Sequence, residues 1–131
     1  MDEIKGLIID TPHIDNILSG KKTWEMRSTL AKRRGLVALI RKGSGKIIGV
    51  ARLVDSIGPF SKAEMLANQS RHMIPTERLA DPRMEKWNKA WVMQDAKLFS
   101  RPVPYIHPNG AVIWVNLDEQ TQAAVREAVR G

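Results

Sequence analysis

The chain has 131 residues, of which 43% are hydrophobic, so it is long enough for one domain with a buried core, spanning residues 1–131. The formal net charge of +7 favours a polyanionic partner, either a nucleic acid or an anionic membrane surface. Cysteine is absent and the three histidines, His13, His72 and His107, lie far apart, which excludes disulfides and argues against a metal site.

The amino-terminal residues lack the basic start and the long apolar core of a signal peptide. No apolar run is long enough to cross a bilayer. We therefore expect a cytoplasmic protein without a membrane partner.

The first residues predict a strand followed by a short helix. Residues 5–10 hold an apolar run that suits a buried strand. Thr11 can cap a helix that continues to Leu18, with Pro12 in its first turn, where a missing N–H costs nothing. Gly20 supplies the left-handed residue that ends such helices.

A second strand is predicted from Thr23 to Arg27, because the side chains alternate there with a period of two. Trp24 and Met26 point to one side, whereas Glu25 and the arginine point to the other. We expect the apolar pair in the core and the charged pair on a concave polar face.

A hairpin follows. Leu36–Lys42 is largely apolar on both faces, which fits a strand packed on both sides, and a tight turn at 43–45 leads to its partner, Ile47–Asp55. Gly49 and Ala51 share one face of that partner strand. Small residues there indicate a barrel corner or the close approach of another backbone or a ligand.

The middle of the chain predicts short helices. Ser61-Lys62-Ala63-Glu64 matches a capping box and predicts a helix over 61–71. A second helix is expected from Asp81 to Trp87. The charged, irregular region 68–89 is interpreted as a lid or an insertion beside a barrel.

The last third predicts a strand at Ala90–Met93 and another at Ala111–Leu117. Prolines within 101–110 exclude a central strand, so this segment is predicted to be an ordered loop. Asp118 caps a final helix.

The motif G-x-K-x-x-E-x-R is formed by Gly20, Lys22, Glu25 and Arg27, and the segments GKIIGVARLVD and PVPYIHPNGAVIWV follow later. Together with the helix before the motif, these features resemble the ASCH family, a branch of the PUA-like superfamily. The resemblance covers nearly the whole chain. It implies an α+β fold, a small open mixed β-barrel with flanking helices.

The same resemblance implies a basic cleft that binds RNA or a nucleobase. Some small members of the family are amidohydrolases that remove an acyl group from the exocyclic amine of cytidine, and at least one other is described as a ribonuclease. Our first expectation is therefore binding of RNA or a modified nucleoside without a cofactor, and a hydrolase is the alternative. A regulatory module that binds a protein or a small anion stays open.

Lys22 has two interpretations. It complements the dipole of the preceding helix, or it lies desolvated in a cleft and acts as a base or nucleophile. In the deacylating relatives a threonine stands at the position of Glu25, and a separate glutamate contributes, for which Glu64 and Glu85 are both candidates. A carboxylate at position 25 should raise the pKa of the lysine, so we expect weak or no deacylase activity.

The candidate site combines the motif with basic and aromatic residues. Lys22 and Glu25 are the catalytic candidates. A basic cluster after the motif strand suits phosphate contacts, and a tryptophan beside the irregular region, Trp87 or Trp91, would let a base stack. The residues expected to bind RNA or a nucleobase are Gly20, Lys21, Lys22, Glu25, Arg27, Lys32, Arg33, Arg34, Arg52, Trp91, Tyr105 and His107.

Overall fold

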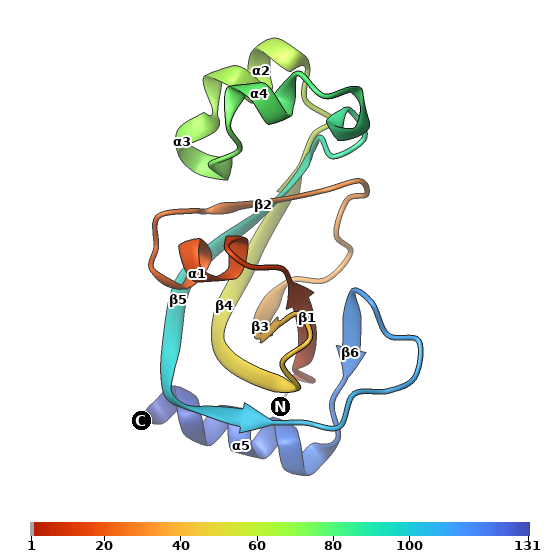
Figure 1. The fold of residues 1–131 in the computed structure, drawn as a ribbon. Helices are drawn as coiled ribbons and strands as arrows, with labels where there is room; N and C mark the ends of the chain where they lie inside the picture. Colours follow the sequence, from red (N-terminus) through yellow and green to blue (C-terminus); the bar gives the residue numbers. More distant parts are fainter. Residues whose placement is uncertain (1) are drawn as a thin grey trace.

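The computed structural model describes residues 2–131 and contains one curled, six-stranded sheet in the order β2-β5-β4-β3-β1-β6 (Figure 1). β1 and β3 are parallel, and the other neighbours are antiparallel. This confirms the predicted α+β fold with an open mixed half-barrel. The strands are β1 (Lys5–Ile9), β2 (Trp24–Arg27), β3 (Gly35–Arg41), β4 (Lys46–Ile57), β5 (Lys89–Pro104) and β6 (Trp114–Asn116).

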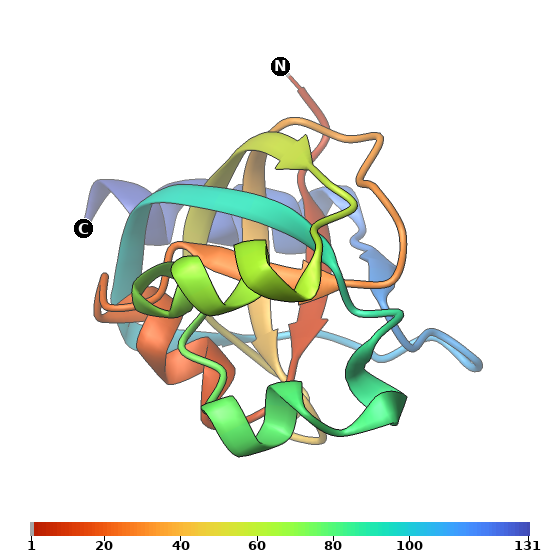
Figure 2. The ribbon, with the colours of Figure 1, turned by 90° about the horizontal axis from the view of Figure 1, so that it is seen from above.

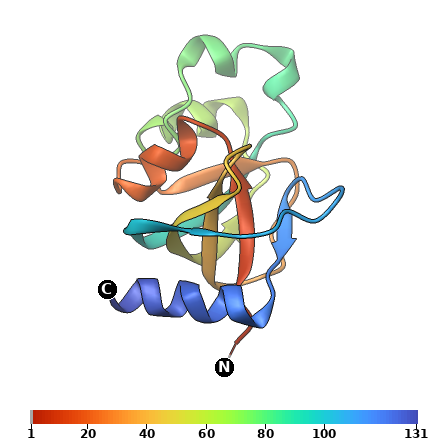
Figure 3. The same ribbon diagram turned by 60° about the horizontal axis from the view of Figure 1, so that its bottom comes forward.

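Helices flank the sheet at both ends. Three short α-helices and a 3-10 helix gather at one end of the long β4–β5 ribbon, and α5 crosses the opposite end (Figures 1 and 3). None of the helices in residues 2–131 combines the length and apolar character needed to span a membrane. The helices are α1 (His13–Leu18), α2 (Lys62–Ala67), α3 (Gln69–His72), α4 (Thr76–Leu79), η1 (Pro82–Met84) and α5 (Glu119–Arg130).

The sheet is buried on both faces, as the apolar run in β3 predicted. Val37 and Leu39 pack in the core beneath α1, whereas Ala38 and Ile40 pack in a second core beneath α5. A third, smaller core lies under the short helices; it holds both apolar residues of β2 together with Met65, Ile74 and Ala90. Burial of Trp24 and Met26 there confirms the predicted alternation.

The sheet curls because β4 bends. Its pairing shifts register against β5 at three places, and such irregularities increase local bending and twist (Figure 2). Gly49 lies at the first of them, where the backbone carbonyl of Lys97 and the Leu18 side chain leave no room for a Cβ. The interpretation of Gly49 as a point of close backbone approach is therefore confirmed.

This close approach gives a test of the fold. Gly49→Ala is expected to cost about 3 kcal/mol of unfolding free energy, because a new methyl group meets backbone that cannot shift cheaply. Urea unfolding measures the cost. Gly6→Ala is the comparison, since its Cβ would clash only with the flexible Cδ1 end of Ile40 and would meet Val115 Cβ at an ordinary 3.4 Å. Equal stability of the two alanine variants would contradict the packing at Gly49.

Two predicted boundaries of secondary structure, the end of β5 and the start of α1, were wrong, and both involve prolines. β5 continues to Pro104 instead of ending at Met93, because β2 pairs only with residues 89–92 and the later half of β5 is an edge, where proline is tolerated. Pro12 is the N-cap of α1 and not in its first turn, and Thr11 makes no capping bond; its hydroxyl accepts from Arg41.

The insertion between β4 and β5 was predicted only in part. The Ser61 capping box is present, but the helix stops after Ala67, where the Asn68 side chain donates to the Glu64 carbonyl and replaces a backbone donor. No pattern in the sequence predicted α4, and η1 ends at Met84, short of Trp87. Likewise, β6 begins at Trp114, later than the predicted Ala111. Asp118 caps α5 as predicted, by accepting from the Thr121 amide.

Candidate functional site

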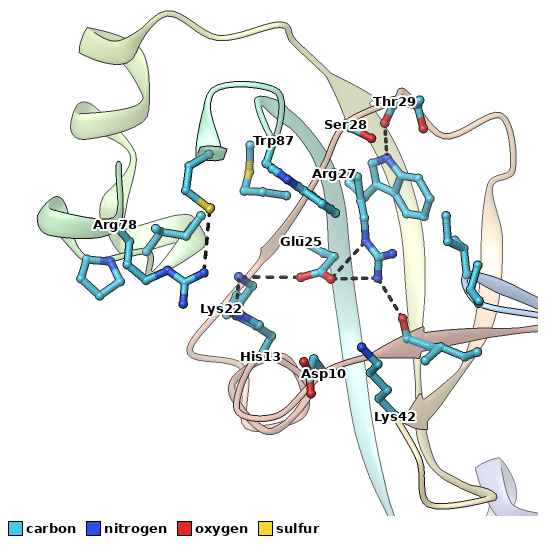
Figure 4. A pocket seen from close by; sticks show the side chains of 18 residues that line it. Asp10, His13, Lys22, Glu25, Arg27, Ser28, Thr29, Lys42, Arg78 and Trp87 are labelled. Atoms are coloured by element: carbon cyan, nitrogen blue, oxygen red, sulfur yellow. Dashed lines mark hydrogen bonds and ion pairs between the residues drawn. The ribbon is translucent and has the colours of Figure 1, made fainter. Parts of the chain in front are cut away.

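A cleft of about 480 Å³ opens between β2, the start of α1 and the insertion (Figure 4). Its apolar lining includes Ile74, Met84 and Ile113. The charged and titratable side chains that line it are Asp10, His13, Lys22, Glu25, Arg27, Lys42 and Arg78.

Lys22 reaches this cleft from the turn before β2. Gly20 adopts φ +82°, which ends α1, and the Lys22 amide then donates to the Asn16 carbonyl at 2.9 Å. The next amide, of Thr23, donates to the Arg71 carbonyl of the insertion. Because Lys22 lies outside the strand, its side chain converges with that of Glu25 instead of pointing to the opposite face.

Lys22 is only 2% exposed, and three polar groups surround its ammonium. Its Nζ donates to the His72 carbonyl at 2.7 Å and lies 3.4 Å from His13 Nδ1 and 3.7 Å from Glu25 Oε1. Burial lowers the pKa of Lys22, the Glu25 carboxylate opposes this, and Arg27 adds to the lowering. Glu25 therefore raises the pKa of Lys22 as predicted, but burial outweighs it, and the pKa lies below its ordinary value.

Glu25 and Arg27 form the second half of the cluster. Glu25 Oε2 accepts from Arg27 Nη2 at 2.9 Å and from Nε at 3.2 Å. The same Nη2 donates to the Ile8 carbonyl at 2.9 Å, and the guanidinium lies over the Trp91 ring. The pair shares one face of β2, as predicted, and it is largely buried, so it differs from an ordinary surface ion pair.

The two cleft tryptophans differ in what they offer a ligand. Trp91 is only 3% exposed: it stacks on Trp114, lies under Arg27 and donates its Nε1–H to the Thr29 carbonyl. It therefore fixes Arg27 and leaves no open ring face. Trp87 is half-buried on the cleft wall, so it is the tryptophan with surface for a stacked base (Figure 4).

His72 connects the insertion to the cluster. Its ring is fully buried; Nδ1 accepts from the Ile74 amide at 2.9 Å, so Nε2 carries the proton and donates to the Met65 carbonyl at 2.7 Å. Its own carbonyl binds the Lys22 ammonium. The imidazole therefore fixes the backbone that holds the lysine.

The family model described as "ASCH domain" matches residues 7–103. The chain belongs to the ASCH domain family. The match runs from within β1 to most of β5, and so includes the motif strand, the whole insertion and every charged residue that lines the cleft.

Solved ASCH structures share this fold. The crystal structure of an ASCH protein from Zymomonas mobilis superposes with a TM-score of 0.73 at 15% identity, covering 95% of this chain and 94% of that chain. A tyrosine-to-phenylalanine variant of the Zymomonas mobilis protein gives a TM-score of 0.72 at 15% identity, with 96% and 98% covered. A serine-to-alanine variant of the same protein gives a TM-score of 0.71 at 16% identity, with 95% of each chain covered. No curated protein matches the chain.

Of the residues that the sequence proposed for the site of this ASCH domain, four line the cleft: Lys22, Glu25, Arg27 and Trp91. The others lie outside its lining. Tyr105 and His107 bond to each other in the loop before β6. Outside the lining as well are Gly20 and Lys21 on the α1–β2 turn, Lys32, Arg33 and Arg34 on the β2–β3 loop, and Arg52 on β4.

The basic cluster after β2 is partly engaged within the protein. Arg33 pairs with Glu3 at 3.8 Å and lies over Trp114, and Arg34 donates to the Ala31 carbonyl. Lys32 is exposed. This ASCH domain therefore presents one free lysine here, not a continuous basic face.

Four charged or titratable cleft residues were missed: Asp10, His13, Lys42 and Arg78. Parallel pairing of β1 with β3 brings the ends of both strands together, so Asp10 and Lys42 could have been found from that pairing. Arg78 comes from α4, a helix that no sequence pattern predicted. Glu64, a candidate second carboxylate, instead caps α2 and lies outside the lining, as does Glu85. Asp10 is the second carboxylate that lines the cleft.

The buried histidine predicts how the stability of this ASCH domain depends on pH. Burial lowers the pKa of His72 below its ordinary value of 6.5, with the nearby Lys22 charge contributing and the Met65 carbonyl opposing. The folded state therefore prefers neutral His72, and this stabilisation is present above pH 6.5 and is lost as the pH falls below it.

Denaturation at several pH values measures this effect. Compared with the native protein, His72→Asn is expected to lose less stability between about pH 7 and pH 5, because an asparagine oxygen accepts from an amide but does not titrate in this range. An equal loss in both proteins would show that His72 does not carry the dependence.

Proposed function

We propose that this ASCH domain binds single-stranded RNA and takes one nucleotide into the cleft around Lys22, Glu25 and Arg27. The observation that carries the proposal is the burial of these three charged side chains at the base of an open cavity. Taking charges out of water costs folding free energy, so a charged cluster inside a cleft indicates a binding or catalytic role.

The cluster keeps hydrogen-bonding capacity for a ligand. Glu25 uses Oε2 for Arg27, whereas its Oε1 lies 3.7 Å from the Lys22 nitrogen, beyond hydrogen-bond distance. That oxygen is suited to accept from the amino or imino group of a base edge, and unstacked bases of single-stranded RNA present these edges. Trp87 adds an aromatic surface on the wall of the same cleft.

The charge of the cleft favours an anion. Four cationic side chains line it against two carboxylates. Lys42 and Arg78 are exposed there, so they are available to phosphate groups. Outside the cleft, Lys32 is proposed as a phosphate contact, and Arg33 and Arg34 add positive charge beside it while keeping their internal contacts. Replacing the three together by alanine is expected to weaken binding of all RNA sequences alike.

Salt dependence tests this proposal. Affinity for a labelled single-stranded RNA, measured by fluorescence anisotropy, is expected to fall about tenfold or more between roughly 50 and 200 mM salt, because neutralised phosphates release counterions. Arg78→Ala should lower both the affinity and its salt dependence. Arg101→Ala, an exposed arginine on β5 outside the cleft, is the matched control. Salt-independent affinity would argue for a small neutral ligand.

A hydrolase is the second candidate, and one observation favours it. Burial lowers the pKa of Lys22, so its amine is more easily neutral than that of an exposed lysine, and a neutral amine can take a proton or attack an acyl carbon. Incubation with acylated cytidine and with RNA, followed by chromatography of the products, decides between binding and turnover. If the native protein turns over acylated cytidine robustly and Lys22→Ala abolishes this turnover, the hydrolase becomes the better-supported function.

A further inference from the structure

A second cavity, which we call the groove, lies beside the cleft in the insertion. It measures about 570 Å³ and is lined by residues of α2, α4 and η1 and by the segment that leads into β5. Met84 and Trp87 line both cavities, so they form part of the wall, or partition, that separates the cleft from the groove. The site described above does not use the groove.

The groove has the surface of a base-binding site. Phe60 and Trp87 give it aromatic walls, and Leu66, which is 47% exposed, adds an apolar one. Asn88 also lines it, and its Oδ1 is buried without a hydrogen-bond partner among the described residues. Because this oxygen has almost no accessible surface, it contributes no contact to a ligand in the groove, and the aromatic and apolar walls are what the groove offers.

Arg78 lies where the two cavities meet. It lines the cleft, whereas its neighbours on α4, Thr76 and Leu79, line the groove. Its guanidinium donates to the sulfur of Met84, a residue of the shared wall, at 3.8 Å, and no ion pair within residues 2–131 engages it (Figure 4). A cation without a carboxylate at the partition complements a phosphate that crosses it.

We propose that the cleft and the groove are adjacent subsites for two consecutive nucleotides of single-stranded RNA. One base lies in the cleft, the linking phosphate lies at Arg78, and the next base lies between the aromatic and apolar walls of the groove. This inference rests on the proposed function and adds the length and the chemistry of the ligand.

The test compares a mononucleotide with a dinucleotide. Calorimetry measures the binding of CMP and of the dinucleotide CpC to the full chain. Ala80→Trp places a large side chain at the groove, and Ala63→Trp makes the same change on an exposed part of α2 outside both cavities. Because stacking and burial of a base contribute about 1–3 kcal/mol, CpC is expected to bind about tenfold more tightly than CMP.

Ala80→Trp should abolish this advantage of CpC and leave the affinity for CMP unchanged, whereas Ala63→Trp should change neither. Leu66→Asp, a smaller change on another exposed residue of the groove, should also reduce the advantage of CpC. If CpC still binds about tenfold more tightly than CMP in both groove variants, the groove is not a nucleotide subsite. It would then bind another partner, such as a peptide. If CMP and RNA fail to bind the native protein at all, the proposed function itself fails.

Discussion

Replacing Lys22 by methionine is expected to make the protein more stable and to abolish its binding of RNA. The net effect of the surroundings is to lower the pKa of this lysine, so they disfavour its ammonium form at neutral pH. Methionine fills a similar volume without a charge, and Glu25 keeps its two hydrogen bonds to Arg27. Because Glu25 keeps Arg27 as its counter-charge, the change leaves no buried charge unpaired and removes the desolvation cost of the ammonium, so we expect a gain of about 1 kcal/mol in unfolding free energy.

The gain should depend on pH in a defined direction. The folded state binds the Lys22 proton less tightly than the unfolded chain, whose lysine has the ordinary pKa of 10.5. The stability cost of native Lys22 is therefore fully present below its lowered folded-state pKa and disappears as the pH rises through that pKa to 10.5. The difference between Lys22→Met and the native protein should shrink over that range.

Thermal and urea unfolding at several pH values measure the stability difference, and anisotropy measures RNA binding. Lys46→Met, a change at an exposed lysine on β4, is the control and should leave both unchanged. A less stable Lys22→Met protein would show that the lysine is structural, as its contacts with the His72 carbonyl and Glu25 would then be worth more than its desolvation.

Local features of the chain, in the motif and at the last helix, could be predicted because each depends on a few neighbouring residues. Gly20 ends α1, the alternation in β2 buries Trp24, and Asp118 starts α5, as the sequence indicated. These features are set by backbone conformation, by the period of the side chains and by a cap.

The electrostatics of the site could not be predicted in the same way. Strand spacing alone would place Lys22 and Glu25 on opposite faces, and the Gly20 stop, which leaves Lys22 in the turn, indicated that they could converge. The burial that dominates the pKa of Lys22, however, involves the insertion, which contributes the His72 carbonyl. Arg78 likewise reaches the cleft only because the short helices of the insertion fold back over β2. Both are long-range effects that leave no periodic pattern in the sequence.

Glu25→Thr is expected to destabilise the protein and to raise any deacylase activity. Glu25 is the carboxylate that bridges Lys22 and Arg27, and its removal leaves two buried cations without a counter-charge. Breaking a buried pair in this way costs about 3–5 kcal/mol. Glu25 also raises the pKa of Lys22, so its loss lowers that pKa further and increases the fraction of neutral amine at pH 7.

Chromatography of acylated cytidine after incubation with each variant measures the activity, and urea unfolding measures the stability. The native protein should show weak or no turnover, because Glu25 favours the ammonium form, and Glu25→Thr should exceed it. Adding Lys22→Met to Glu25→Thr should remove the activity and recover part of the lost stability, since one of the two uncompensated cations is then absent. Glu127→Thr, at an exposed glutamate of α5, is the matched control for both measurements. Turnover by the double variant would show that the lysine amine is not the group that Glu25 restrains.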